Sequence, residues 1–101
     1  MAGSFFVGVC RIEISLPTAQ SLKDRRAILQ SVTARMRREF SVSVADLDAQ
    51  PHYGRAVLGL AAVSNQASHA RDVVETAARF LENTRLDAEI ETIEFDVLPA
   101  W

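Results

Sequence analysis

Residues 5–16, FFVGVCRIEISL, alternate between two kinds of side chain and decide how the fold begins. The even-numbered positions are apolar or small, whereas the polar residues Arg11, Glu13 and Ser15 fall on odd-numbered positions. Successive side chains of a β-strand point to opposite faces, so this pattern predicts a strand with one face in the core and one face open. Pro17 ends the predicted strand.

The rest of the chain supplies five more elements. Apolar periodicity predicts a helix over residues 22–40, strands over 41–48 and 55–63, a second helix that ends at Asn83-Thr84, and a last strand over 87–98. This order is that of the α+β ferredoxin-like split β-α-β fold, a four-stranded antiparallel sheet with both helices on one face. The first and third strands are then central. The 101 residues form one domain, 1–101, with an ordered core over about 5–98.

Local signals set the ends of the later elements. The second helix has a candidate N-cap at Ser64-Asn65 and another at Ser68. In the last strand an apolar residue falls out of phase, which predicts a bulge near Thr92. Pro99 is expected to end that strand.

The composition is that of a soluble globular protein. Hydrophobic residues make up 49% and charged residues 24% of the chain, and a single cysteine excludes an internal disulfide. That cysteine, Cys10, lies in an apolar strand and is expected to be a small buried residue. The first apolar run has no basic start and is soon broken by Arg11 and Glu13, which argues against a signal peptide or membrane span. We expect a cytoplasmic protein with no membrane contact.

The first turn of the first predicted helix carries an unusual number of positive charges. Ser21 is a good N-cap and Asp24 can complete a capping box, but Lys23, Arg25 and Arg26 crowd the same turn. A helix N-terminus behaves like a partial positive charge, so each cation there is disfavoured by about 0.3–1 kcal/mol. An anion held by the free N–H groups and these side chains would explain the choice. Alternatively, the side chains are merely solvated, and pairing with the protein's own carboxylates would remove the case for an external anion.

A polar ridge continues this charge along the helix. Its members are spaced three and four residues apart and are Lys23, Arg26, Gln30, Thr33 and Arg37. Beside it runs the apolar stripe expected to face the core, which is Leu22, Leu29, Val32, Met36 and Phe40, flanked by Ile28. The predicted phosphate-binding or RNA-binding residues are Lys23, Arg25, Arg26, Gln30 and Arg37.

Charge is divided unevenly along the chain. Residues 1–40 carry seven bases and three acids, whereas residues 41–101 carry four bases and ten acids, for a net charge of −2. This acidic balance argues against a protein that binds nucleic acid over its whole surface. A localised basic face can still bind phosphate.

The sequence contains no motif for catalysis, metal binding or a cofactor. Glycine patterns that bind phosphates or dinucleotides are absent, and Cys10, His52 and His69 lack ligand spacing. Asp46 and Asp48 could hold a cation or act as acids, but charges on an edge strand more often prevent unwanted strand pairing. We therefore expect no metal, no cofactor and no enzymatic activity.

One enzyme class shares this order of elements. Acylphosphatases hold phosphate in a loop with glycine and arginine between the first strand and the first helix. Here that loop is Pro17-Thr18-Ala19-Gln20, which contains neither. A hydrolase of this kind is the least favoured hypothesis.

The sheet face without helices is expected to be apolar at Val7 and Val9 and beside the third strand. An apolar sheet face open to solvent typically marks an interface, which predicts a homodimer or another partner there. This face lacks the aromatic residues of an RNA-recognition sheet, so any RNA contact should use the helix cations.

Four segments also carry a family resemblance: VGVCRIE at 7–13, SLKDRR at 21–26, FSVSVA at 40–45 and AVLGLAAVS at 56–64. With them the chain resembles the YlxP-like family (bacterial domain of unknown function 503) over nearly its whole length. The resemblance implies a ferredoxin-like fold and a gene neighbourhood shared with translation initiation and ribosome-maturation factors. It implies no established reaction and no cofactor. Arg25 stands where relatives often have lysine.

Three hypotheses for function follow. The first is a small cytoplasmic protein that binds RNA or the ribosome through phosphate contacts of the first helix. The second is a protein-interaction or homo-oligomerisation module that binds an acidic partner, including the acidic last strand of another copy. The third is the acylphosphatase-like hydrolase.

Overall fold

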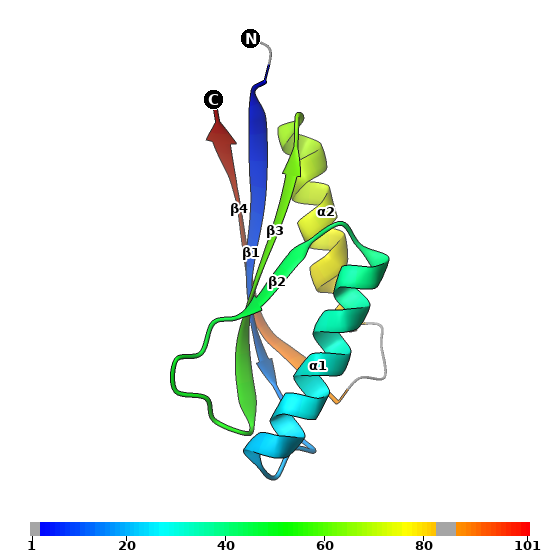
Figure 1. Ribbon diagram of the computed structural model, residues 1–101, viewed down its shortest axis with the longest axis vertical. Helices are drawn as coiled ribbons and strands as arrows, with labels where there is room; N and C mark the ends of the chain where they lie inside the picture. The colour runs from blue at the N-terminus through cyan, green and yellow to red at the C-terminus, as the bar shows by residue number, and fades with distance from the viewer. Residues whose placement is uncertain (1–2, 83–86) are drawn as a thin grey trace.

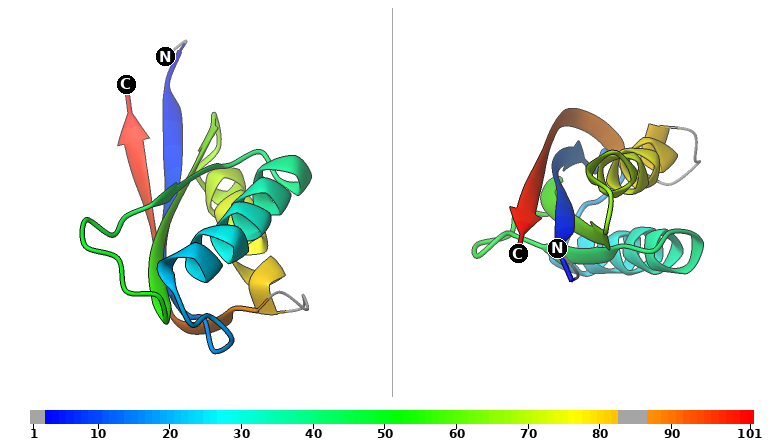
Figure 2. Two further views of the ribbon diagram at one scale, coloured as in Figure 1. Left: turned by 60° about the horizontal axis from the view of Figure 1, so that its bottom comes forward. Right: turned by 90° about the horizontal axis from the view of Figure 1, so that it is seen from above.

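Four antiparallel strands form one open sheet, and two helices pack on one of its faces (Figure 1, Figure 2). The computed structural model describes residues 3–82 and 87–101. Its elements are β1 (Phe5–Ser15), α1 (Leu22–Glu39), β2 (Ser43–Asp46), β3 (Arg55–Ser64), α2 (Ala67–Arg79), a 3-10 turn (Phe80–Glu82) and β4 (Glu89–Ala100). The sheet order β2-β3-β1-β4 places the first and third strands in the centre. The predicted α+β, ferredoxin-like fold is confirmed.

The alternation of β1 places the core where the sequence predicts it. Gly8, Cys10, Ile12 and Ile14 are buried under the helices, whereas Arg11 on the opposite face is exposed. The buried side of β1 shares the core with residues of β3 and both helices, among them Leu58, Leu60, Val32, Met36, Val74 and Ala77. Burial raises the pKa of the Cys10 thiol to about 11, so this cysteine is a packed, unreactive residue as expected.

The last strand confirms the predicted bulge and corrects the predicted end. The register of β1 against β4 shifts after Glu13, where Glu91 is the extra residue between Ile90 and Thr92. The strand continues through Pro99 and does not end before it. Prolines are tolerated on edge strands, and β4 is the edge of this sheet.

Two other boundaries differ from those predicted. β2 has four residues, Ser43–Asp46, within the longer strand predicted over 41–48. α2 starts at Ala67 after Gln66, whose side chain makes no cap hydrogen bond. Of the predicted caps, Ser64 accepts the Gln66 N–H in the turn before the helix, and Ser68 lies within the helix. The predicted end of the second helix at Asn83-Thr84 lies outside the described residues.

The N-terminus of α1 forms the predicted capping arrangement. The Ser21 hydroxyl accepts a hydrogen bond from the Asp24 N–H at 3.0 Å. The Asp24 carboxylate in turn accepts the N–H of Gln20 at 2.9 Å. The single acid of this turn is therefore held at the helix start, where a negative charge is stabilising.

β1 and α2 approach each other very closely at one glycine. A Cβ atom placed on Gly8 would lie 2.3 Å from the backbone carbonyl oxygen of Ala70, which is itself fully buried. A backbone carbonyl within a helix cannot turn aside as a flexible side chain can. Gly8 therefore sets the distance between β1 and α2.

Replacing Gly8 by alanine should lower the free energy of unfolding by about 2–3 kcal/mol, because α2 must move away from the sheet. Gly59→Ala is the matched control. The three atoms nearest to a Cβ atom there all belong to the Leu47 side chain, the closest at 3.1 Å, and that side chain can rotate. Urea unfolding followed by circular dichroism measures both, and equal losses would contradict the proposed backbone clash.

Candidate functional site

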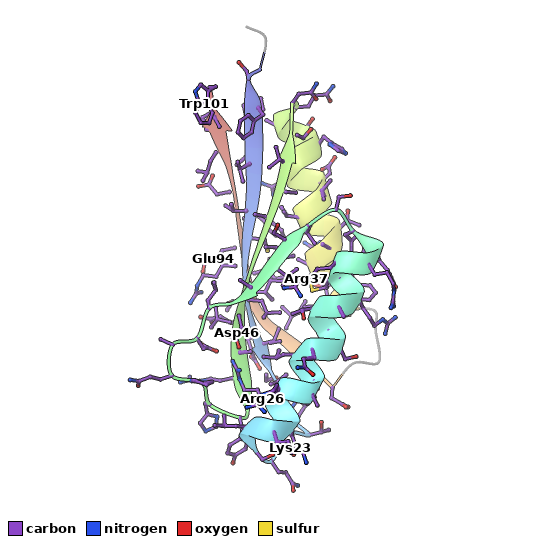
Figure 3. The ribbon with its side chains drawn as sticks, viewed as in Figure 1. Lys23, Arg26, Arg37, Asp46, Glu94 and Trp101 are labelled. Atoms are coloured by element: carbon purple, nitrogen blue, oxygen red, sulfur yellow. The ribbon has the colours of Figure 1, made fainter. Side chains whose placement is uncertain are left out.

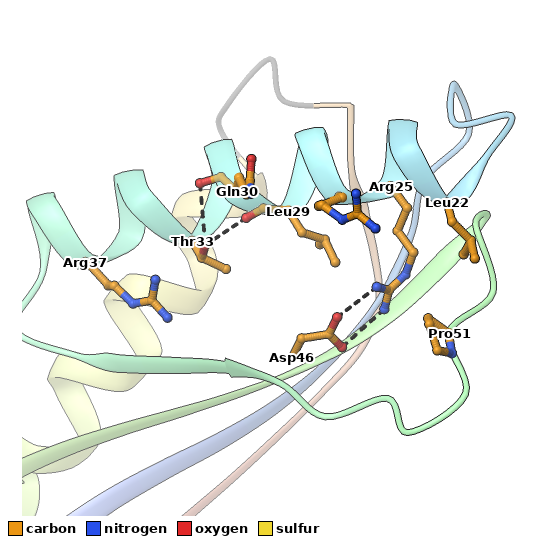
Figure 4. Close-up of a pocket in the computed structure, with 9 residues that line it drawn as sticks. Leu22, Arg25, Leu29, Gln30, Thr33, Arg37, Asp46 and Pro51 are labelled. Carbon is orange, nitrogen blue, oxygen red and sulfur yellow. Dashed lines mark hydrogen bonds and ion pairs between the residues drawn. The ribbon is translucent and has the colours of Figure 1, made fainter.

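Arg25, in the first turn of α1, is buried and bound to the protein's own carboxylates. It is 6% exposed. Its Nη1 donates to Asp46 Oδ2 at 2.8 Å and its Nη2 donates to Asp46 Oδ1 at 3.2 Å (Figure 4). Nη2 also donates to Asp48 Oδ2 at 2.9 Å, and Nε donates to the Arg55 carbonyl at 3.1 Å. We call Arg25, Asp46 and Asp48 the Arg25 clamp.

The clamp corrects three predictions. Arg25 does not belong to an external anion site, since four of its five N–H donors already have acceptors within the chain. Asp46 and Asp48, predicted as charges that prevent strand pairing at the sheet edge, hold this guanidinium. Leu22, predicted in the apolar stripe, is 50% exposed, and Arg25 takes its place beside Leu29.

The clamp joins parts of the chain that are distant in sequence. Asp48 also accepts the N–H of Val57 in β3, at 3.2 Å, so α1, the β2–β3 loop and β3 meet at one cluster. Hydrogen bonds from Arg25 lower the pKa of Asp46 below its usual value, and the same bonds raise the pKa of Arg25. Both groups are held in their charged forms.

Four of the five other cations of α1 are exposed and have no acid beside them in the described residues. Within residues 3–82 and 87–101, Lys23, Arg26, Arg37 and Arg38 have no carboxylate within 4.0 Å. Five arginines do have one, namely Arg11, Arg25, Arg35, Arg71 and Arg79. Figure 3 shows Lys23, Arg26 and Arg37 along α1. We call Lys23, Arg26, Arg37 and Arg38 the α1 cations.

A groove of about 350 Å³ lies between α1 and the edge formed by β2 and the following loop (Figure 4). It is lined by four of the five predicted ridge residues, Arg26, Gln30, Thr33 and Arg37. The Thr33 hydroxyl donates to the Leu29 carbonyl at 2.8 Å, and Arg37 donates one bond to the Val44 carbonyl. Arg37 keeps four further N–H donors, and the Gln30 amide is exposed.

The structure thus divides the predicted site residues into three groups. Arg26, Gln30 and Arg37 come together in the groove. Arg25 also lines it but is buried and bound by acids, and Lys23 lies on the same helix outside the groove. Arg38 is an exposed cation of the same helix that the sequence analysis did not select. Its position one residue after Arg37, off the three-and-four spacing of the ridge, explains the omission.

Other site types find no support in the described part of the chain. There, no three His, Cys, Asp or Glu side chains gather where they could hold a metal ion. No helix in the same residues is long and apolar enough to cross a membrane. The concentration of cations on α1 is the feature that points to a ligand.

Comparison with known proteins agrees with the family resemblance of the sequence. The sequence model described as "Protein of unknown function (DUF503)" matches residues 7–95. A relative from Bacillus subtilis (strain 168), "Uncharacterized protein YlxP", is 27% identical over 77 residues, which cover 76% of this chain and 84% of the relative. Among solved structures, "De novo designed protein Foldit4" matches 92% of this chain and 94% of its own, with 17% identity and a TM-score of 0.47.

Substitutions of two neighbouring arginines distinguish the role of the Arg25 clamp from that of the exposed ridge. Arg25→Ala should lower the free energy of unfolding by about 3 kcal/mol, since it leaves Asp46 and Asp48 without their partner. Arg26→Ala makes the same chemical change one residue later and should alter stability by less than about 0.5 kcal/mol. Urea unfolding measures both, and similar losses would contradict a structural role specific to Arg25.

The clamp should also make the free energy of unfolding depend on pH in the acidic range. Because the pKa of Asp46 is lowered in the folded state, its stabilising effect is full above its unfolded value of about 3.9 and is lost as the pH falls through the folded value. Unfolding free energies measured between about pH 2 and 5 should therefore fall less steeply for Asp46→Asn than for the wild type. Asp72→Asn, an exposed site on α2, should keep the wild-type slope. An unchanged slope in Asp46→Asn would contradict the prediction.

Proposed function

We propose that this chain, which belongs to the DUF503 family of proteins of unknown function, is a small RNA-binding protein that contacts phosphates, including those of ribosomal RNA, through α1. One observation carries the proposal. Four of the six bases of α1 are exposed with no carboxylate partner in the described chain, whereas the arginines of β1 and α2 are paired. Such unpaired cations on a net acidic protein are available for an external anion.

The spread of the cations favours a polyanion over a single small ion. Lys23 and Arg38 are fifteen residues apart on one helix, which corresponds to about 22 Å along its axis. One phosphate ion would contact only one or two of the side chains. A nucleic-acid strand carries a phosphate on every nucleotide and can contact several of them at once.

The groove adds a second kind of contact. Arg26 and Arg37 provide charge at its rim, and the exposed amide of Gln30 lies between them along the helix. An amide donates and accepts hydrogen bonds, so it suits a sugar hydroxyl or a base edge. The open sheet face presents Val7, Val9 and Arg11 along β1, and its aromatic Phe5, at the end of that strand, is already stacked on Trp101, which favours recognition through the backbone of RNA.

RNA binding should depend strongly on salt and on the α1 cations. Neutralisation of three or four phosphates predicts that log affinity falls with log salt concentration at a slope of about −2 to −4. The variant with Lys23→Ala and Arg26→Ala should bind single-stranded RNA at least about 10-fold more weakly at about 0.1 M salt, with a slope shallower by about 1.4. Fluorescence anisotropy with labelled RNA measures both quantities.

The matched control is the pair Arg71→Ala and Arg79→Ala, which removes the same charge from α2, where both arginines are paired with Glu75. It should bind RNA like the wild type. Equal losses of RNA affinity in the two variants would mean that binding depends on the net charge of the protein and not on the α1 cations. A wild-type protein that binds neither RNA nor sedimented ribosomal subunits would contradict the proposed function.

A further inference from the structure

The sheet face opposite the helices carries an apolar patch at the end where both chain termini lie (Figure 1). One row crosses three strands, since Val7 of β1 pairs with Val63 of β3 and with Leu98 of β4. Val63 is 66% exposed and Leu98 is 47% exposed. The neighbouring rows add three more residues, so the open patch comprises Phe5, Val7, Val9, Ala61, Val63 and Leu98.

The open patch continues into a shallow apolar trough. Beside Val9 and Ala61, the half-exposed Leu47 leans over Gly59, where an added Cβ would lie 3.1 Å from Leu47 Cδ1. The trough has a volume of about 370 Å³, and Ser43 is its one polar side chain. Gly59 and Ala61 are small and Leu47 stands beside them, so this part of the face is a depression that apolar side chains of another surface can fill.

The molecule exposes more surface than a monomer of its size normally does. Its accessible surface is 6298 Å², whereas a single-chain protein of 11.1 kDa exposes about 5,700 Å². Its radius of gyration is 14.3 Å against about 12.7 Å for a compact domain of this length. The open sheet face, which no helix covers, contributes to this excess.

The charges favour a second copy of the same chain as the occupant. The one charge in the rows of the open patch is Asp96, which pairs with Val9 at the β4 rim, so the apolar centres of two identical patches can meet without repulsion. Next to it, Arg11 is already paired within the chain, with Glu13 at 3.0 Å and Glu94 at 3.2 Å. Asp96 lies at the β4 rim, where two-fold packing can leave it in solvent.

Pairing through the strand edges is disfavoured by comparison. β4 is one edge of the sheet and carries the acids Glu89, Glu91, Glu94 and Asp96 as well as Pro99, all of which oppose the addition of another strand. The other edge, β2, has only four residues. Self-association therefore has the open face available and not the edges.

We propose that two copies of the chain form a two-fold symmetric dimer in which the open patches pack face to face. The two sheets would lie about 10 Å apart, as in other sheet-on-sheet packings. Since α1 packs on the other face of each sheet, both sets of α1 cations stay on the outside of the dimer (Figure 2). The inference does not rest on RNA binding, and RNA binding does not require it.

Light scattering after size exclusion, at about 100 µM protein in about 0.05 M and 1 M NaCl, tests the dimer. We expect a mass of twice 11.1 kDa at both salt concentrations, because apolar contacts are not weakened by screening. Val63→Glu should raise the dimer dissociation constant by about 100-fold or more, since each dimer carries the change twice. Leu22→Glu, at an exposed leucine of α1, should leave the dimer intact.

Circular dichroism checks that Val63→Glu remains folded, and Val63→Cys gives a second, independent test. A flexible thiol-specific crosslinker that spans about 10–15 Å should join the two introduced thiols across the facing sheets, whereas it should not join Leu22→Cys. A monomeric wild type at both salt concentrations would overturn the proposal, as would a folded Val63→Glu variant that remains dimeric. A dimer that dissociates at 1 M NaCl would also overturn it and would point to contact between α1 and the acidic β4. RNA affinity at protein concentrations below dimerisation is measured separately, so the two proposals can fail independently.

Discussion

One buried guanidinium fixes the first helix to the rest of the fold. Arg25 comes from α1, whereas its acceptors lie at the end of β2, in the following loop and at the start of β3. A buried cation costs several kcal/mol to desolvate unless it is paired and hydrogen-bonded, so the loop that carries Asp46 and Asp48 must close onto the helix. This contact also sets the rotation of α1 about its axis. Because successive residues are about 100° apart, an inward Arg25 turns Arg26 and the residues in phase with it toward the groove.

The clamp also determines which charged groups of the groove are free to bind an anion. Asp46 lines the groove together with Arg26 and Arg37. Without Arg25, its carboxylate would be the natural partner of those arginines, and the groove would lose the charge that suits a phosphate. Because Arg25 is bound to it, the negative charge of Asp46 is already paired within the protein. Arg25, which the sequence predicted in the anion site, is therefore bound by the protein's own acids, and its ion pair with Asp46 leaves Arg26 and Arg37 free of that carboxylate.

Much of the fold follows from patterns that depend on neighbouring residues alone. The alternation of β1, the cap at Ser21 and the bulge at Glu91 are each set by short-range geometry, and the structure confirms them. The role of Arg25 depends on two acids more than twenty residues away, which no local pattern reveals. One signal was available: position 25 lies in helical phase with the buried Leu29, Val32 and Met36. A cation in the phase of an apolar stripe, in a chain with two closely spaced aspartates, is a candidate for a buried ion pair. The end of β4 was missed because proline interrupts a central strand but not an edge strand.

The two faces of the sheet have different chemistry because only one of them receives helices. A sheet has two faces, and a stable domain buries its apolar ones against another layer. In the described chain both helices lie on the same face, as the right-handed crossovers of this fold require. The opposite face is therefore left with whatever side chains the sequence provides. At its lower end they are charged and paired within the chain, through Arg11, Glu13 and Glu94. At its upper end they are valine, alanine and leucine, whose exposure to water is unfavourable. In the proposed dimer, the layer that covers this end is the same face of a second copy.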